Sequence, residues 1–337
     1  MNIVYSSSDS YAEICGISLL SLYENNKEID EIVTYIIDND ISPENKNNLR
    51  KIGKKYERKI IFKEKFDIEK ISKTKINVGR WNIGTFFRLF LGKILPISVK
   101  KVMYFDCDMI IRHNLKSIYN LDIGDCIVAG ADDCRSDNYR KEIGLKHGDT
   151  YINNGFLLIN LKKWRSLQLD DEFTTYISNH NGDITYMDQG VLNAILGKKK
   201  LVFEITPKYN AQRIFFDFSY NEILKLRKPE YHCSESNYNE ATNDPVIIHF
   251  TPTFITGTRP WNIKDNHKFT PEYLKYKAIS PWNEIPKRKD DRKRSKKIMT
   301  WICKATPRPI MIRIMSYFHS TWYPKNRMKK NFSKKLS

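Results

Sequence analysis

The sequence predicts a mixed α/β fold with a mostly parallel sheet covered by helices on both faces. Over its first two thirds, short apolar runs alternate with helical segments, and such alternation is typical of parallel sheets. Polar residues also gather where several apolar runs end, and ligands of open α/β sheets bind at the carboxyl ends of strands. The 337 residues can hold one large α/β domain with an appendage, or two modest domains.

The expected elements follow one another at short spacing. Helical patterns predict helices at residues 11–24 and 43–57, and the second has a clear start because Ser42 can cap it and Pro43 suits the first helical position. Apolar runs predict strands at residues 2–6, 31–37, 59–62, 101–105, 126–131, 155–161, 200–205 and 246–250. The composition changes near residue 285, where a run of charged residues begins. We therefore expect a domain of residues 1–284 and an extension of residues 285–337.

The net charge of +18 is concentrated in that extension. Residues 287–337 carry 17 Lys and Arg against two Asp, a net charge of +15. The other 286 residues carry 40 Lys and Arg against 37 Asp and Glu, a net charge of only +3. The basicity therefore belongs to the extension and does not describe the body.

Cysteine usage and the amino-terminal residues bear on location. The six cysteines contain no CxxC pair, a pattern that favours reduced thiols over a disulfide framework or a zinc site. The first residues, MNIVY, have no basic stretch of the kind that opens a signal peptide. We therefore expect a cytoplasmic protein, peripheral on the inner face of the cytoplasmic membrane.

Two Asp-x-Asp pairs follow apolar strands. Two carboxylates spaced in this way can ligate one hard cation, but in a chain this rich in Asp the pattern alone is weak. Asp38 and Asp40 form one pair, and Asp106 and Asp108 form the other. Only the second pair has further motifs around it.

Those motifs are TFFRLFLG at 85–92, YINNGFLLINLKKW at 151–164, MDQGVL at 187–192, HFT at 249–251 and RPW at 259–261. Together they resemble family 8 of the retaining glycosyltransferases, and most of all the galactosyl- and glucosyltransferases that build the lipopolysaccharide core. The resemblance covers residues 1 to about 280, and SPW at 280–282 matches an extension of that subgroup. It implies a GT-A type, single Rossmann-like nucleotide-sugar domain.

The resemblance also implies a metal site and a donor. Asp106, Asp108 and His249 match the metal ligands, and a nitrogen ligand beside two carboxylates favours Mn²⁺ over Mg²⁺. Such a cation would neutralise the leaving diphosphate of a UDP-sugar. Residues that match the donor site are Ser6, Ser7, Asp9, Tyr11, Arg88, Cys107, Asn153, Gly257 and Arg259.

Two departures from the family pattern fall in the donor site. Ser8 stands where the family has an Asp in the first loop. The loop after His249 is longer, with residues 252–255 inserted, and Arg259 replaces a lysine. An arginine can still bind phosphate, and bidentately.

The residue that matches the position beneath the anomeric carbon is Gln189, next to Asp188, which matches a residue that holds donor hydroxyls. An amide is a poor nucleophile, so we favour a front-side, oxocarbenium-like transfer over a covalent double displacement. Asp133 is a candidate for the acceptor side by position only.

The basic, aromatic extension suits the headgroup zone of an anionic membrane, where it could hold the enzyme beside a lipid-linked oligosaccharide acceptor. A solvated tail and a nucleic-acid surface are the alternatives, and we expect no nucleic acid.

We therefore expect a retaining hexosyltransferase that moves galactose or glucose from UDP-galactose or UDP-glucose in lipopolysaccharide core biosynthesis. Capsule or protein-glycan synthesis would use the same chemistry. The rival of another class is a non-catalytic basic protein that binds anionic lipid or nucleic acid.

Overall fold

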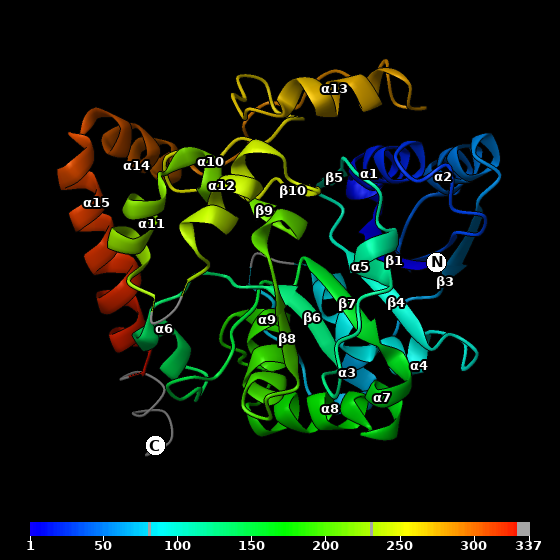
Figure 1. Ribbon diagram of the computed structural model, residues 1–337, viewed down its shortest axis with the longest axis horizontal. Coiled ribbons are helices and arrows are strands. Elements are labelled where there is room, and N and C mark those ends of the chain that lie inside the picture. Colours follow the sequence, from blue (N-terminus) through cyan, green and yellow to red (C-terminus); the bar gives the residue numbers. More distant parts are fainter. Residues whose placement is uncertain (80–81, 230–231, 329–337) are drawn as a thin grey trace.

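The structure is a computed structural model that describes residues 1–79, 82–229 and 232–328 (Figure 1). Its centre is a seven-stranded sheet with the order β3-β2-β1-β4-β7-β6-β8. All neighbours are parallel except those of β7, which runs antiparallel to β4 and β6. The strands are β1 (Asn2–Ser8), β2 (Val33–Asn39), β3 (Lys59–Lys63), β4 (Lys101–Phe105), β6 (Val128–Ala131), β7 (Phe156–Asn160) and β8 (Val202–Ile205).

A second, three-stranded sheet has the order β5-β10-β9. Strand β10 (Ile247–His249) pairs antiparallel with β5 (Met109–Ile111) and parallel with β9 (Ala211–Gln212). The predicted run at 246–250 is therefore a strand of this small sheet and not of the main one, which periodicity in the sequence does not distinguish.

Alternating side chains of the central strands enter two different cores, because successive residues of a strand face opposite sides of a sheet. Ile3 and Tyr5 belong to the core that also contains α1 (Ala12–Glu24). Val4, between them, belongs to the other core, with Trp164 and Phe173. This two-sided burial confirms the predicted arrangement of helices on both faces.

The helices of the first face include α1, α2 (Pro43–Lys55) and α13 (Thr270–Ala278), which lie together on one side of the molecule (Figure 1). Ser42 caps α2 as predicted, since its side chain accepts a hydrogen bond from the backbone N–H of Asn45. The other α-helices that precede the extension, within the described residues, are α3 (Ile68–Ser72), α4 (Leu91–Ile94), α5 (Lys116–Tyr119), α6 (Asp137–Lys141), α7 (Leu161–Ser166), α8 (Leu169–Asn179), α9 (Met187–Leu192), α10 (Ile214–Asp217), α11 (Tyr220–Arg227) and α12 (Glu235–Asn243).

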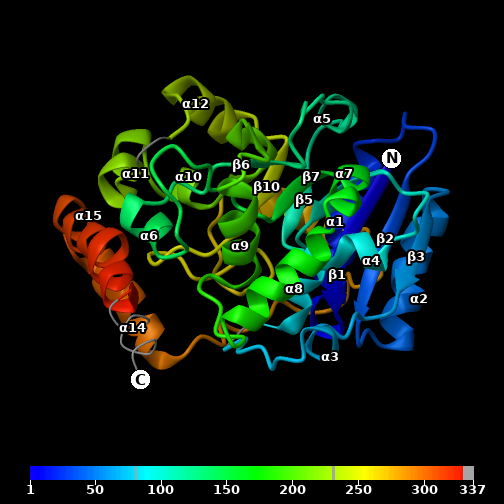
Figure 2. The same cartoon turned by 90° about the horizontal axis from the view of Figure 1, so that it is seen from below.

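The carboxyl-terminal extension forms α14 (Arg294–Ala305) and α15 (Arg308–Tyr317). Figures 1 and 2 both show these helices at the end of the molecule opposite β3. They are packed against the body, because Cys303, Met311, Ile312 and Met315 are buried in one apolar cluster with Phe215, Phe218, Ile223 and Leu226. Within the described residues, no helix combines the length and the apolar character needed to cross a membrane.

Candidate active site

Strand pairing brings the predicted metal ligands together. Strand β4 lies beside β1, with Phe105 opposite Tyr5, so Asp106 follows the sheet at the edge where β1 ends. His249 pairs with Met109, the residue after Asp108. The two Asp and the His therefore meet although about 140 residues separate them in the sequence.

The three side chains form a cluster of metal-ligand type. Their donor atoms all lie within 4.8 Å of one another. Nε2 of His249 is 3.2 Å from Oδ1 of Asp108 and 3.8 Å from Oδ2 of Asp106. Two carboxylates and one imidazole suit a divalent transition metal such as Mn²⁺.

The imidazole of His249 is oriented by a hydrogen bond to its second ring nitrogen. Its Nδ1 is hydrogen-bonded to Oδ1 of Asn210 at 2.9 Å, so that Nε2 faces the carboxylates. Such outer partners fix the ring orientation of metal-binding histidines. Gly155 leaves the space that the ring needs, because a Cβ there would lie 2.8 Å from Nδ1 of His249.

Arg88 connects this cluster to a third carboxylate. Its side chain is 4% exposed, with NH2 2.6 Å from Oδ1 of Asp106 and Nε 2.9 Å from Oδ2 of Asp188. Burial raises the pKa of Asp106 and of Asp188, while the Arg88 charge opposes that rise. Arg88 thus takes part in the buried site.

Of the two carboxyl groups, that of Asp108 has a lowered pKa and that of Asp106 a raised one, so Asp108 loses its proton more readily. Burial alone would raise its pKa, but His249 and Arg259 outweigh burial and hold it below the ordinary value. The Arg259 guanidinium is 3.6 Å from Oδ2 of Asp108 and donates a hydrogen bond to the Tyr11 hydroxyl at 3.1 Å. The cluster therefore keeps an ionised carboxylate beside a fixed cation.

These groups open into a cavity of about 280 Å³. Its lining includes the predicted residues Ser6, Ser7, Tyr11, Arg88, Asp106, Cys107, Asp108 and Arg259, together with Ser8, Ser10, Asn39, Asn82, Gly84, Thr85 and Tyr104. Asn39 and Asn82 were missed by sequence reasoning. Asn39 ends β2, the strand beside β1, so the rule that ligands bind at strand ends could have found it.

Five predicted donor or catalytic residues lie outside this lining, and two of them make contacts elsewhere. The Asp9 carboxylate accepts hydrogen bonds from the backbone N–H of Ser42 and from Asn45, at the start of α2. Gly257 lies against Arg292 of the extension. Asp188 lies behind the lining, paired with Arg88. The last two, Asn153 and Gln189, belong to a neighbouring network.

That network fixes the Gln189 carboxamide. Its Nε2 donates to Oδ2 of Asp133 and to the Tyr151 hydroxyl, both at 2.9 Å, and its Oε1 accepts from Nδ2 of Asn153 at 3.2 Å. Burial would raise the pKa of Asp133, but the Arg135 charge outweighs burial and holds that pKa below its ordinary value. An ionised Asp133 therefore determines which way the amide of Gln189 points.

The other Asp-x-Asp pair lies elsewhere. Asp38 forms an ion pair with Lys46 and accepts a hydrogen bond from the backbone N–H of Ile41. The Asp40 carboxylate is 74% exposed and pairs with Lys65. Asp38 thus lies in β2 and Asp40 just beyond it, each paired with a lysine, whereas Asp106 and Asp108 meet His249.

A mixed α/β domain whose strand ends carry a cluster of two Asp and one His beside a cavity has the architecture of a sugar transferase. The model of glycosyl transferase family 8 matches residues 2–265, so the chain belongs to that family. Its fold is that of a family 8 glycosyltransferase.

Curated relatives agree with this assignment. General stress protein A of Bacillus subtilis (strain 168) is 28% identical over 85% of this chain and 96% of its own length. The lipopolysaccharide glucosyltransferase WaaO of Escherichia coli (strain K12) is 26% identical over 84% of this chain and 79% of its own length. A putative glycosyltransferase of Haemophilus influenzae is 31% identical, but the match spans only 61% of this chain and 64% of that relative.

Among solved structures, the galactosyltransferase LgtC in complex with donor and acceptor sugar analogs superposes with a TM-score of 0.68. It is 23% identical, and the match covers 83% of this chain and 96% of that one. At this identity the likeness shows the fold, which confirms the predicted GT-A type.

Proposed function

We propose that this chain is a retaining, Mn²⁺-dependent hexosyltransferase that moves galactose or glucose from a UDP-sugar to a hydroxyl of a saccharide acceptor. The observation that carries the proposal is the meeting of Asp106, Asp108 and His249 at the edge of a cavity lined by several of the predicted donor residues. The cation would neutralise the leaving diphosphate. Mg²⁺ is the alternative, which the nitrogen of His249 makes less favourable.

Each of several site residues would have a role in a front-side transfer. Arg259 would bind the diphosphate, and Arg88, Asn153 and Asp188 would hold the donor sugar. The bond from the anomeric carbon to UDP breaks, the acceptor oxygen bonds to the same face, and its proton passes to the diphosphate oxygen. The Gln189 amide, oriented by Asp133, would stabilise the positive charge that develops on the sugar.

The test is release of UDP from UDP-galactose and from UDP-glucose, with and without Mn²⁺. We expect Mn²⁺-dependent release with one of the two sugars, which Asp108→Asn abolishes. The matched control is Asp40→Asn, the same substitution in the exposed Asp-x-Asp pair, which should leave release unchanged. No turnover together with no Mn²⁺-dependent binding of UDP would favour the rival, a non-catalytic basic protein that binds anionic lipid or nucleic acid.

We further propose that the acceptor is a lipid-linked oligosaccharide of the lipopolysaccharide core and that the enzyme works on the inner membrane surface. The names of the Escherichia coli relatives support this acceptor class. Synthesis of capsule or of a protein glycan would use the same residues. Transfer to acceptors extracted from each source distinguishes the three.

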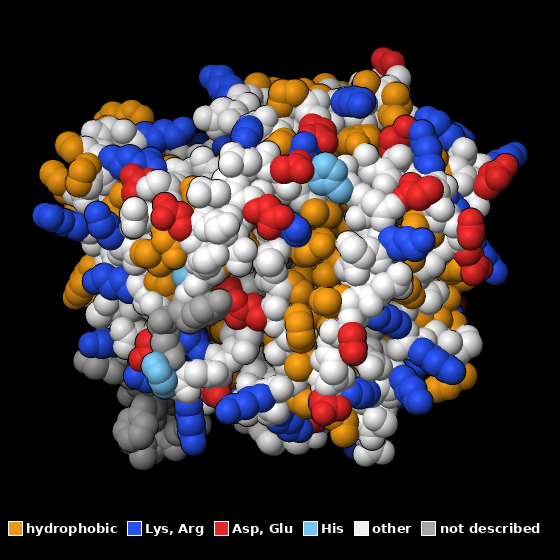
Figure 3. Space-filling view, viewed as in Figure 1, with side chains coloured by type: hydrophobic (Ala, Val, Ile, Leu, Met, Phe, Trp, Pro, Cys, Tyr) orange, Lys and Arg blue, Asp and Glu red, His pale blue; other side chains and the backbone are white. Residues whose placement is uncertain are grey.

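The surface of α14 and α15 supports membrane attachment. Its exposed apolar side chains alternate with basic ones, which Figure 3 shows in orange and blue at the left edge. They are Ile298, Met299, Trp301, Ile302, Ile310, Ile314 and Tyr317, beside Lys297, Lys304 and Arg313. Such a surface can bind anionic headgroups, with about 1 kcal/mol for each basic residue engaged.

Point variants test this attachment better than deletion, because deletion would also remove buried residues of the extension. We expect Trp301→Ser with Met299→Ser to lower the fraction bound to anionic vesicles, and Lys304→Gln with Arg313→Gln to lower it further at low salt. If none of these substitutions changes the fraction bound to anionic vesicles, the surface of α14 and α15 is not the site of membrane attachment. Ile97→Ser, an exposed apolar residue outside the extension, is the control.

A further inference from the structure

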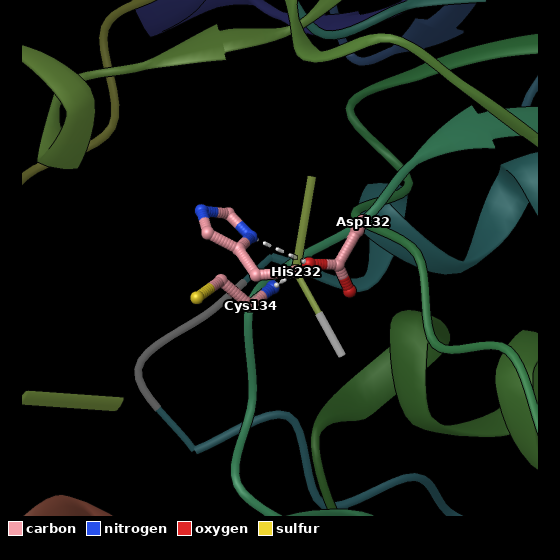
Figure 4. Close-up of side chains that lie close together, drawn as sticks. All are labelled: Asp132, Cys134 and His232. Atoms are coloured by element: carbon pink, nitrogen blue, oxygen red, sulfur yellow. Dashed lines mark hydrogen bonds and ion pairs between the residues drawn. The ribbon is translucent and has the colours of Figure 1, made fainter. Parts of the chain in front are cut away.

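We propose that Asp132, Cys134 and His232 form a second metal site, distinct from the donor site, that takes Zn²⁺. The proposal goes beyond the transfer reaction and does not depend on it. Figure 4 shows the three side chains close together, with a dashed line between the His232 ring and the Asp132 carboxylate. Their ligand atoms all lie within 4.8 Å of one another.

The donor set indicates which metal would bind. A thiolate with an imidazole and a carboxylate suits Zn²⁺, whereas Mg²⁺ and Ca²⁺ prefer oxygen alone. Tetrahedral zinc with its usual bond lengths sets neighbouring ligand atoms roughly 3.3 to 3.8 Å apart. Nδ1 of His232 and Oδ2 of Asp132 are already 3.1 Å apart, so side-chain rotations of about 1 Å would complete the site.

The His232 ring is held in position for this role. Phe215 and Tyr220 stack on it, with ring centroids 6.1 and 5.8 Å away and interplanar angles of 13° and 15°. Its Nδ1 faces Asp132, while its Nε2 lies 3.7 Å from Sγ of Cys233. Cys233 therefore lies beside the second ring nitrogen, where metal-binding histidines usually have a hydrogen-bond partner.

The site lies directly beside the catalytic network. Asp132 and Cys134 flank Asp133, which orients Gln189. A metal bound to both flanking residues would fix the backbone that carries Asp133. Sequence analysis did not find this site because His232 is about 100 residues from the other two ligands.

The first experiment measures zinc in the full-length protein, purified without a metal-affinity tag. We expect about one zinc per chain, and a loss of at least about tenfold in Cys134→Ser and in His232→Phe. Phe at position 232 keeps the ring stacking, and Cys303→Ser is the control because Cys303 is buried in the same apolar cluster as Cys134. Asp108→Asn should retain the zinc, because that ligand belongs to the donor site.

Cobalt replacement gives a second measurement. Co²⁺ bound at this site should show a thiolate-to-metal charge-transfer band that Cys134→Ser removes and Cys303→Ser keeps. Zinc that persists in Cys134→Ser and His232→Phe, or that is lost only in Asp108→Asn, would overturn the proposal. So would wild-type protein that holds no zinc and gives no such band with Co²⁺.

Discussion

The two carboxylate oxygens of Asp106 face different partners: Arg88 donates a hydrogen bond to Oδ1 at 2.6 Å, while Oδ2 faces His249 at 3.8 Å. The same arginine reaches Asp188 at 2.9 Å. One buried cation therefore compensates two carboxylates and still leaves an oxygen of Asp106 free to bind a metal.

Replacing Arg88 should destabilise the whole site. Arg88→Met leaves Asp106 and Asp188 buried without their cation, which should cost about 3–5 kcal/mol of unfolding free energy. Arg88→Lys keeps the charge but cannot contact both carboxylates in the same way, so its cost should be smaller. Urea unfolding measures both, and equal stability of Arg88→Met and wild type would show that the charges are compensated elsewhere.

Gly155→Ala should weaken metal binding more than it weakens the fold. The added Cβ would lie 2.8 Å from Nδ1 of His249, so the imidazole must move away from the carboxylates. We expect the affinity for Mn²⁺ in the presence of UDP, measured by calorimetry, to fall at least about tenfold. Gly124→Ala is the control: its φ of +54° strains an alanine, but nothing lies within 4 Å of the new Cβ, so affinity should not change.

The extension should behave as part of the folded body. Ile312 is 6% exposed in the cluster shared with α11, whereas Ile314, on the same helix, is 47% exposed. We expect Ile312→Ala to cost about 2–4 kcal/mol of unfolding free energy and Ile314→Ala to change it by less than about 0.5 kcal/mol. Equal, small effects in chemical unfolding would mean that the extension is not packed on the body.

The contribution of the Glu142 carboxyl to the free energy of unfolding should fall as pH rises. Burial raises its pKa from 4.5 to about 7, against the opposing contacts with Tyr186 and Arg327. The folded state therefore holds this proton more tightly than the unfolded chain, so the stability from this group is complete below pH 4.5 and is lost as pH approaches 7.

The corresponding measurement compares the Tm of wild type and Glu142→Gln between about pH 5 and about pH 8. The variant should gain relative to wild type as pH rises through this interval. Glu222→Gln is the contrast, because the hydrogen bond from Arg308 lowers the pKa of Glu222 and its effect should be flat over the same range. A constant difference for Glu142→Gln would place its pKa outside the interval.

The sequence predicted the parts of the fold that local patterns determine. The long strands and α1 and α2 lie within a few residues of their expected bounds, because each carries its own apolar run or cap. Strands β5 and β9 have only three and two residues, too few for any periodicity. His249 is hydrogen-bonded to Asn210, and Gln189 to Asp133. Each partner comes from a distant segment of the sequence, and no local pattern predicts such contacts.

Within the candidate site, the predicted residues at strand ends meet one another, whereas two predicted residues outside the strands contact other parts of the chain. Asp106, Asp108 and His249 meet as expected because β-sheet register fixes them. Asp9 begins a three-residue 3-10 helix and Gly257 lies on a loop, and the position of such short segments depends on what packs beside them. Here those neighbours are the start of α2 and Arg292 of the extension.

The metal-type cluster joins the two sheets. Asp106 directly follows β4 of the large sheet, Asp108 directly precedes β5 of the small sheet, and His249 ends β10 of the small sheet. A bound cation would thus resist sliding of one sheet against the other and link their unfolding. At about 100 times its dissociation constant such a ligand adds about 2.7 kcal/mol, so occupancy of the donor site would set how rigidly the two halves of the molecule move together.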